Sequence, residues 1–206
     1  MIKFIYFDVG GVAIRDFSGT GRWADFIKEI GITDAQAEAF RAVWDEHEQE
    51  FSIGRELDVI LPVIEEDFGI QLPKEYTLLN GLVSRFAVNP PIWPAIEYAR
   101  SKARVGLLTN MFNGMLDAIN DRQLLPPGEW AAVVDSSIEM LKKPDHELFK
   151  LAEKRAGFSG QEILFIDNTA GHIEAAKAFG WQTFLYDSAD VEQSSNELLK
   201  LLKNSL

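Results

Sequence analysis

The sequence contains no cysteine, which excludes disulfide bonds, thiolate catalysis and cysteine-bound metal centres. It also lacks an apolar run close to the ~20 residues that cross a bilayer. The apolar run from Met1 to Phe7 meets Asp8 too early to have the length of a signal peptide. These absences lead us to expect a cytoplasmic protein that spans no membrane.

Basic residues are scarce: 20 lysines and arginines stand against 32 aspartates and glutamates, for a formal net charge of −12. Nucleic acids and anionic membranes both select basic surfaces, so we expect neither as a partner. The glycines do not form a G-x-G-x-x-G or a G-x-x-x-x-G-K-[ST] pattern, which excludes the two commonest nucleotide-binding loops. Composition indicates no oligomeric state.

The apolar content is sufficient for a folded core, with 47% hydrophobic and 25% charged residues. Five short apolar runs have the length and bulk of strands buried on both faces: Ile2 to Phe7, Val105 to Leu108, Ala131 to Val134, Ile163 to Ile166 and Thr183 to Tyr186. Helical spacing marks four stretches among and after these runs: Met111 to Asn120, His146 to Ala156, Gly171 to Phe179 and Asp190 to Leu206. This alternation predicts an α/β fold, a Rossmann-like doubly wound parallel sheet.

A long segment after the first predicted strand has a different pattern. Residues 16–88 show helical periodicity with breaks at glycines and prolines, and we see no strand pattern within them. We therefore predict a helical cap domain over 16–88, inserted into an α/β core domain formed by 1–15 and 89–206.

Polar side chains follow the predicted strands where those strands end, and ligands of open parallel sheets bind at this edge. Asp8 follows the first run, Thr109 and Asn110 follow the second, and Asp167 follows the fourth. Lys143 precedes a proline, which disfavours a helical conformation at that lysine and leaves it in an extended turn.

Two carboxylates at one sheet edge raise each other's pKa unless a cation neutralises them. Oxygen ligands without cysteine or a histidine set favour a hard ion, so the pattern predicts Mg²⁺. A lysine of the Lys142-Lys143-Pro144-Asp145 segment could also serve as the cation. Asp135 and Asp187 also follow predicted strands, and each has the ordinary alternative of a turn former or helix cap.

Four segments resemble, in order, the four motifs of the haloacid-dehalogenase-like (HAD) hydrolases. They are Phe7-Asp8-Val9-Gly10-Gly11-Val12; Leu108-Thr109-Asn110; Lys143-Pro144-Asp145 with Leu148-Phe149; and Phe165-Ile166-Asp167-Asn168, continuing through His172-Ile173-Glu174-Ala175-Ala176 to Gly180-Trp181. The insert corresponds to the small helical cap of that family. The Gly-Gly pair and the segment from Trp44 to Gly54 look most similar to its sugar-phosphate phosphatase and epoxide-hydrolase N-terminal-domain branch.

The resemblance implies a Mg²⁺-dependent phosphohydrolase of small phosphorylated metabolites, sugar phosphates among them, that works through an aspartyl-phosphate. It implies that Asp8 is the nucleophile, with Lys143 and Thr109 as the other catalytic residues. The implied phosphate-binding set is Thr109, Asn110, Gly10 and Lys143, and the implied Mg²⁺ ligands are Asp8, the carbonyl of Gly10 and Asp167.

Two positions depart from the family pattern. Gly10 stands where many HAD phosphatases carry a second aspartate that protonates the leaving group, and Asn168 stands where many carry an acid. His47 or Glu48 of the cap could supply the proton, although the alternative for that run is an exposed acidic helix face. Trp23 and Trp44 could line the substrate cleft.

Three other functions stay open. The departures at Gly10 and Asn168 suit a non-catalytic HAD-fold protein that binds or regulates, whereas retention of all four motifs argues for chemistry. Haloacid dehalogenation uses the same nucleophile but in relatives with tyrosine at the Gly10 position and no Mg²⁺. A phosphotransferase would share the aspartyl-phosphate and differ only in the acceptor.

Overall fold

The central sheet confirms the predicted α/β class. The computed structural model describes all 206 residues, and its main sheet has five parallel strands in the order β5-β4-β1-β6-β7. In chain order these strands are β1 (Phe4–Phe7), β4 (Arg104–Thr109), β5 (Val133–Asp135), β6 (Ile163–Asp167) and β7 (Gln182–Leu185). All five predicted runs therefore form strands, with ends that differ by at most two residues from the prediction.

The sheet is buried on both faces because its strands are apolar at successive positions. Side chains of a strand alternate between the two faces, and β1 illustrates this. Ile5 and Phe7 pack in one hydrophobic cluster, whereas Phe4 and Tyr6 pack in a second one. An uninterrupted apolar run is therefore what a central parallel strand requires.

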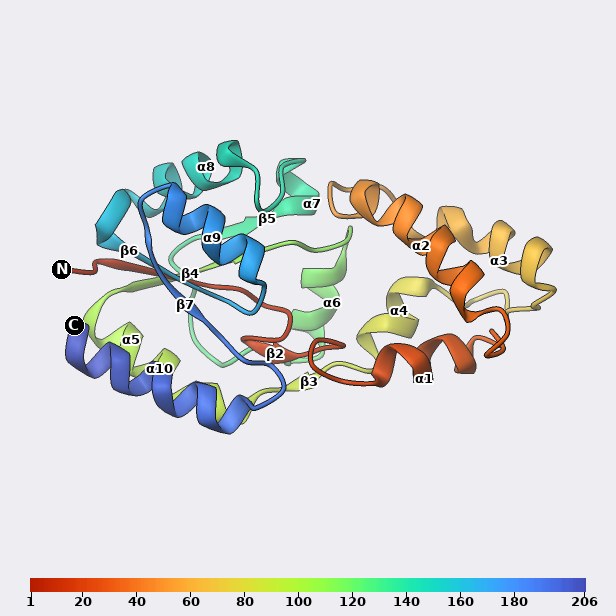
Figure 1. Cartoon of the computed structure of the whole chain (residues 1–206), viewed down its shortest axis with the longest axis horizontal. Coiled ribbons are helices and arrows are strands. Elements are labelled where there is room, and N and C mark those ends of the chain that lie inside the picture. The colour runs from red at the N-terminus through yellow and green to blue at the C-terminus, as the bar shows by residue number, and fades with distance from the viewer.

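Two pairs of helices cover the two faces of the sheet (Figure 1). One face carries α8 (His146–Ala156) and α9 (Ala170–Ala178), and the other carries α5 (Trp93–Lys102) and α10 (Val191–Ser205). Short helices α6 (Met115–Asp121) and α7 (Ser136–Glu139) follow β4 and β5. The helix predicted from Met111 starts four residues later, at Met115, since Gly114 adopts a left-handed conformation just before it.

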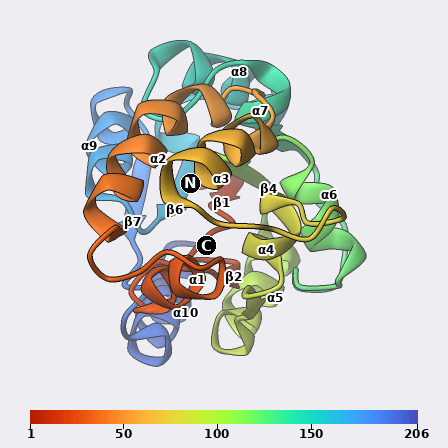
Figure 2. The ribbon, with the colours of Figure 1, turned by 90° about the vertical axis from the view of Figure 1, so that its right-hand side faces the viewer.

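The segment between β1 and α5 forms a group of helices beyond the carboxyl ends of the sheet strands (Figures 1 and 2). It comprises α1 (Arg22–Glu29), α2 (Ala37–Phe51), the 3₁₀ helix η1 (Leu57–Ile60), α3 (Leu61–Phe68) and α4 (Leu78–Val83). We call residues 16–88 the helical insert. None of the helices in the chain is both long and apolar enough to cross a membrane.

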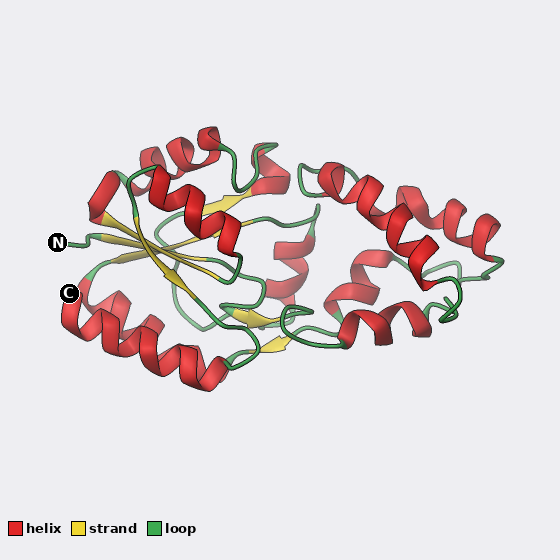
Figure 3. Cartoon of the chain, viewed as in Figure 1, coloured by secondary structure: helices red, strands yellow, loops and turns green.

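Two very short strands stand where the helical insert meets the core (Figure 3). β2 (Ile14–Arg15) pairs antiparallel with β3 (Ala87–Val88). The expectation that no strand occurs within 16–88 is wrong at this end, because a two-residue strand is too short to show a periodic pattern. That the insert behaves as a separate domain stays a prediction.

Gly106 of β4 tests how tightly the sheet packs against its neighbours. A Cβ added there would lie 2.6 Å from the carbonyl oxygen of Ala132 and 2.9 Å from the ring of Phe4. Gly106→Ala should therefore lower the free energy of unfolding by about 1–3 kcal/mol, the usual cost of overpacking, in denaturant titrations. Gly171→Ala in α9 is the matched control: no atom lies within 4 Å of its added Cβ, and alanine should stabilise the helix by up to about 1 kcal/mol. Equal effects of the two substitutions would contradict the packing argument.

Candidate active site

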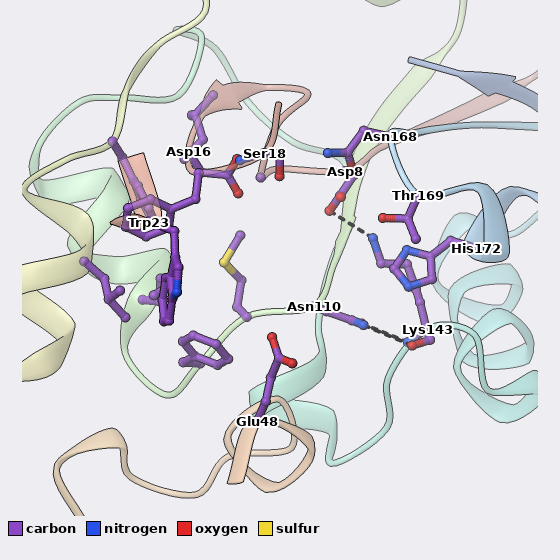
Figure 4. Close-up of a pocket in the computed structure, with 18 of the residues that line it drawn as sticks. Asp8, Asp16, Ser18, Trp23, Glu48, Asn110, Lys143, Asn168, Thr169 and His172 are labelled. Atoms are coloured by element: carbon purple, nitrogen blue, oxygen red, sulfur yellow. Dashed lines mark hydrogen bonds and ion pairs between the residues drawn. The ribbon is translucent and has the colours of Figure 1, made fainter. Parts of the chain in front are cut away.

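Three predicted site residues meet at the carboxyl edge of the three central strands. Asp8 follows β1, Thr109 ends β4 and Asp167 ends β6, and β4, β1 and β6 are neighbours in the sheet. A cavity of about 490 Å³ opens between this edge and the helical insert (Figure 4). It is lined by Asp8, Gly10, Ile14, Asp16, Phe17, Ser18, Trp23, Arg41, Trp44, Glu48, Leu82, Phe86, Asn110, Met111, Phe112, Met115, Lys143, Asn168, Thr169 and His172.

Lys143 joins the two buried carboxylates. Its Nζ lies 2.9 Å from Asp8 Oδ1 and 2.6 Å from Asp167 Oδ2. The lysine side chain is only 1% exposed and that of Asp167 is 0% exposed, so the ion pairs are shielded from water. The prediction that Asp8, Lys143 and Asp167 share one site agrees with this geometry.

The side chain of Asn110 holds the backbone of Lys143 in place. The Lys143 backbone N–H donates to Asn110 Oδ1 at 2.8 Å, and Asn110 Nδ2 donates to the Lys143 carbonyl at 3.0 Å (Figure 4). This double hydrogen bond ties the loop after β4 to the turn that precedes α8. The sequence predicts a phosphate-binding role for Asn110, and the structure adds a positioning role that no local sequence pattern signals.

The two carboxyl groups differ in how readily they ionise. Burial raises the pKa of Asp8 to about 6, in spite of the nearby positive charge of Lys143. Burial acts in the same direction on Asp167, but Lys143 and His172 outweigh it and hold the pKa of Asp167 well below its usual range. Asp167 accepts hydrogen bonds from the Thr169 N–H at 2.7 Å and contacts His172 Nδ1 at 3.1 Å. Asp167 is therefore the more acidic member of the pair.

The donor set fits Mg²⁺. No group of three acidic, histidine or cysteine side chains forms a protein-only metal centre. Mg²⁺ keeps several waters and binds through one or two carboxylates, which Asp8 and Asp167 supply. Lys143 alone provides one positive charge for these two carboxylates, so a further cation is electrostatically favourable.

Thr109 is fully buried and its hydroxyl has no hydrogen-bond partner. Unlike Asn110, its neighbour in the chain, Thr109 does not line the cavity. A buried hydroxyl without a partner costs free energy, and such atoms in folded proteins call for an explanation. An anion bound at the end of β4 would provide an acceptor for this hydroxyl.

Asp16 is a site residue that the motif comparison missed. A Cβ added to Gly10 would lie 2.5 Å from Asp16 Oδ2, so the Asp16 carboxylate occupies the space of a side chain at position 10. Burial raises the pKa of the Asp16 carboxyl, with hydrogen bonds from Ser18 acting in the opposite direction. No sequence signal identifies it, because only the folded path of the loop brings residue 16 back over residue 10.

Of the two proton donors expected from the helical insert, only one lines the cavity. Glu48 of α2 enters it, together with Trp23, Trp44 and Arg41. His47 instead contacts the carbonyl of Val43 at 2.9 Å on its own helix and stacks on Phe51, with ring centroids 5.8 Å apart. The structure thus gives no support to His47 as a proton donor.

The other strand-end carboxylates have structural roles. Asp135 caps α7 by accepting from the Ser137 N–H at 2.9 Å. Asp187 accepts from the Ala189 N–H at 2.8 Å in a turn. Asn168, in contrast, lines the cavity and donates to Ser188 Oγ at 2.9 Å. Asp135 is therefore a helix cap and Asp187 a turn former, the ordinary alternative expected for both.

A family model of haloacid dehalogenase-like hydrolases matches residues 2–180. The chain therefore belongs to the haloacid dehalogenase-like hydrolases and is a hydrolase with a Rossmann-like core, as its motifs indicated. The branch within the family stays a prediction. A comparison with curated proteins finds no match.

Solved structures with the same fold include both phosphate-binding and dehalogenating proteins. A HAD family enzyme, BT-2542 from Bacteroides thetaiotaomicron in complex with magnesium and inorganic phosphate, superposes with a TM-score of 0.75 at 20% identity, covering 92% of this chain and 96% of that one. A predicted HAD-like hydrolase from Porphyromonas gingivalis gives a TM-score of 0.67 at 20% identity, with 97% and 98% coverage. L-2-haloacid dehalogenase from Xanthobacter autotrophicus gives 0.65 at 19% identity, with 90% and 78% coverage. These identities establish the shared fold alone.

Removal of the shared lysine should destabilise the protein in a pH-dependent way. Lys143→Met leaves two buried carboxylates without their cation, which should lower the free energy of unfolding by about 3–5 kcal/mol at neutral pH. Without Lys143, the folded-state pKa of these carboxyls lies above the unfolded value, so the deficit relative to wild type should shrink as the pH falls and both take up protons. Urea titrations with a metal chelator, at about pH 7 and about pH 5, measure this change.

Lys142→Met is the matched control, since Lys142 makes none of these contacts and should change stability little at either pH. A deficit of the same size at both pH values would contradict the assignment of Lys143 as counter-ion of Asp8 and Asp167.

Proposed function

We propose that this hydrolase is a Mg²⁺-dependent phosphatase that cleaves small phosphorylated metabolites through a phosphoryl group on Asp8. The observation that supports it most is the pair of carboxylates, Asp8 and Asp167, held by one buried lysine. Asp8 and this lysine line the cavity, and Asp167 lies buried behind them. A phosphate monoester is dianionic, so a site for it needs positive charge as well as a nucleophile. Lys143 and a bound Mg²⁺ together would meet that requirement.

Asp8 is oriented for attack on phosphorus. Its Oδ1 accepts hydrogen bonds from the backbone N–H of Val9 at 2.8 Å and from Lys143 Nζ at 2.9 Å. Its Oδ2 has no hydrogen bond. Attack by Oδ2 forms an aspartyl-phosphate and releases the alcohol, and water then hydrolyses this intermediate to inorganic phosphate. Lys143, which lines the cavity, stabilises charge on the transferring phosphoryl oxygens.

The Mg²⁺ would be held by Asp8, Asp167 and the backbone carbonyl of Gly10. Bound there, it would supply positive charge that screens the phosphate from the carboxylates. Asn110 holds the backbone of Lys143 through its two hydrogen bonds.

The cavity suits a small organic group attached to the phosphate. Its volume of about 490 Å³ lies in the range of small-molecule sites, and its wall in the helical insert combines aromatic rings with three charged side chains. Trp23 and Trp44 contact each other, with ring centroids 4.9 Å apart, and Arg41 stacks 5.7 Å from the centroid of Trp23. Sugar phosphates fit this combination, because sugar rings pack on aromatic faces and their hydroxyls bond to charged groups.

A dehalogenase would need the same nucleophile and is the main competing activity, since haloacid dehalogenases share this fold. One feature disfavours it: Gly10 leaves position 10 without the tyrosine of the dehalogenating relatives.

Phosphate release from a panel of sugar phosphates and simple esters, with and without Mg²⁺, tests the proposal. We expect Mg²⁺-dependent release by the wild type and none above background for Asp8→Asn, which lacks the nucleophile but keeps the side-chain shape. The same preparations incubated with 2-haloacids should release no halide. Halide release, or phosphate release that survives in Asp8→Asn, would refute the assignment.

Binding of Mg²⁺ gives a second readout that does not depend on turnover. The ion should raise the free energy of unfolding by about 2.7 kcal/mol at 100 times its dissociation constant. Asp167→Asn should lose most of this stabilisation, whereas Asp135→Asn, the helix cap outside the cavity, should retain it.

A further inference from the structure

The Asp16 carboxylate stands in for the side chain that position 10 lacks. We propose that Asp16 is the general acid and base of this enzyme: it protonates the leaving alcohol and then activates the water that hydrolyses the aspartyl-phosphate. The inference rests on the proposed phosphatase function and adds a catalytic residue to it.

The path of the chain after Asp8 brings Asp16 to this place. The backbone turns at Gly11, which has a φ of 72°, and the Ile14 N–H then donates to the Val9 carbonyl at 3.0 Å. Gly10 and Ile14 form an isolated β-bridge, so the chain returns past residue 10 before it enters the helical insert. Asp16 follows that bridge by two residues and lies above Gly10.

A side chain at position 10 would overlap the carboxylate of Asp16 as it lies in this structure. A Cβ on Gly10 would approach Asp16 Oδ2 to 2.5 Å, which is closer than Cβ contacts in folded proteins. The other carboxylate oxygen, Oδ1, is fixed by the Ser18 N–H at 2.8 Å. Oδ1 therefore anchors the side chain, and Oδ2 is directed at the space above Gly10. Gly10 and Asp16 both line the cavity (Figure 4).

The other proton-carrying groups of the cavity are less well placed. His172 Nδ1 contacts both oxygens of Asp167, at 3.2 Å and 3.1 Å, and Lys143 is bound between Asp8 and Asp167. Figure 4 shows Glu48 entering from α2, across the cavity from Asp8 and Asp16. Asp16 is thus the acidic side chain of the cavity that lies next to position 10.

The two chemical steps balance with one carboxyl group. In the first, Asp8 Oδ2 forms a bond to phosphorus as the bond from phosphorus to the ester oxygen breaks, and protonated Asp16 gives its proton to that oxygen, so a neutral alcohol leaves. In the second, the Asp16 carboxylate takes a proton from water as the water oxygen bonds to phosphorus and the bond to Asp8 breaks. Inorganic phosphate leaves, and Asp8 and protonated Asp16 are regenerated.

The substitution Asp16→Asn keeps the shape of the side chain and the bond from Ser18, so the variant should fold. With an alkyl phosphate, whose alcohol needs a proton to leave, first-turnover alcohol release should fall by about 10²–10⁴-fold. With p-nitrophenyl phosphate, whose phenolate leaves without a proton, the first turnover should fall less than about tenfold. Later turnovers should be slow, and intact-protein mass spectrometry should show enzyme carrying one phosphoryl group.

Moving the carboxylate back to position 10 provides an independent test. Gly10→Asp alone places its side chain where Asp16 Oδ2 lies and should displace that carboxylate from its present position. Gly10→Asp combined with Asp16→Ala removes that clash and should recover alkyl phosphate turnover to above the level of Asp16→Asn. Asp34→Asn, at an exposed carboxylate paired with Lys28 outside the cavity, is the control and should match wild type.

The outcomes separate the inference from the function on which it rests. Failure of the wild type to release phosphate from any ester would refute the phosphatase function itself. The role of Asp16 would be refuted if the wild type is active and the first-turnover rate of Asp16→Asn falls by the same factor on alkyl and nitrophenyl esters. An unchanged rate in Asp16→Asn would also refute it. A leaving-group-dependent loss in Glu48→Gln and not in Asp16→Asn would also refute it, in favour of Glu48.

Discussion

The ion pairs of Lys143 are the interaction on which the site depends. Two carboxylates at neighbouring strand ends would repel each other in a buried setting, and a lysine between them makes their closeness tolerable. Such an arrangement is a weak source of net stability, because all three charges lose their hydration. It does fix geometry, since Lys143, Asp8 and Asp167 cannot move independently. The Asn110 clamp extends this constraint to the backbone of the loop that carries the lysine.

Much of the fold could be predicted because its signals are local. Uninterrupted apolar runs identify buried parallel strands, and the rule that ligands bind at their carboxyl ends selects Asp8, Thr109 and Asp167 without any structure. Lys143 was identifiable from the proline that follows it and from its motif. Each of these inferences needs only the residues of one strand or turn, which explains their agreement with the structure.

The features that escaped prediction all depend on how the chain returns upon itself. Asp16 is six residues from Gly10, and no periodicity or motif marks its return over that glycine. Glu48 lines the cavity and its neighbour His47 does not, because of the direction in which α2 faces. The acidic, mixed sequence of α2 does not indicate that direction. The role of the Asn110 side chain requires contact with a residue 33 positions away. Spacing along the chain carries no information on such contacts.

The small ladder of β2 and β3 has a consequence for how this protein can change over evolutionary time. Ile14 faces Val88 and Arg15 faces Ala87, so the chain leaves the core and re-enters it at one point. A loop that starts and ends at the same place can grow, shrink or be exchanged without altering the order of the strands behind it. The floor of the cavity, with its charged groups, and the wall built from 16–88 are therefore open to separate selection, one for the reaction and the other for the molecule admitted to it.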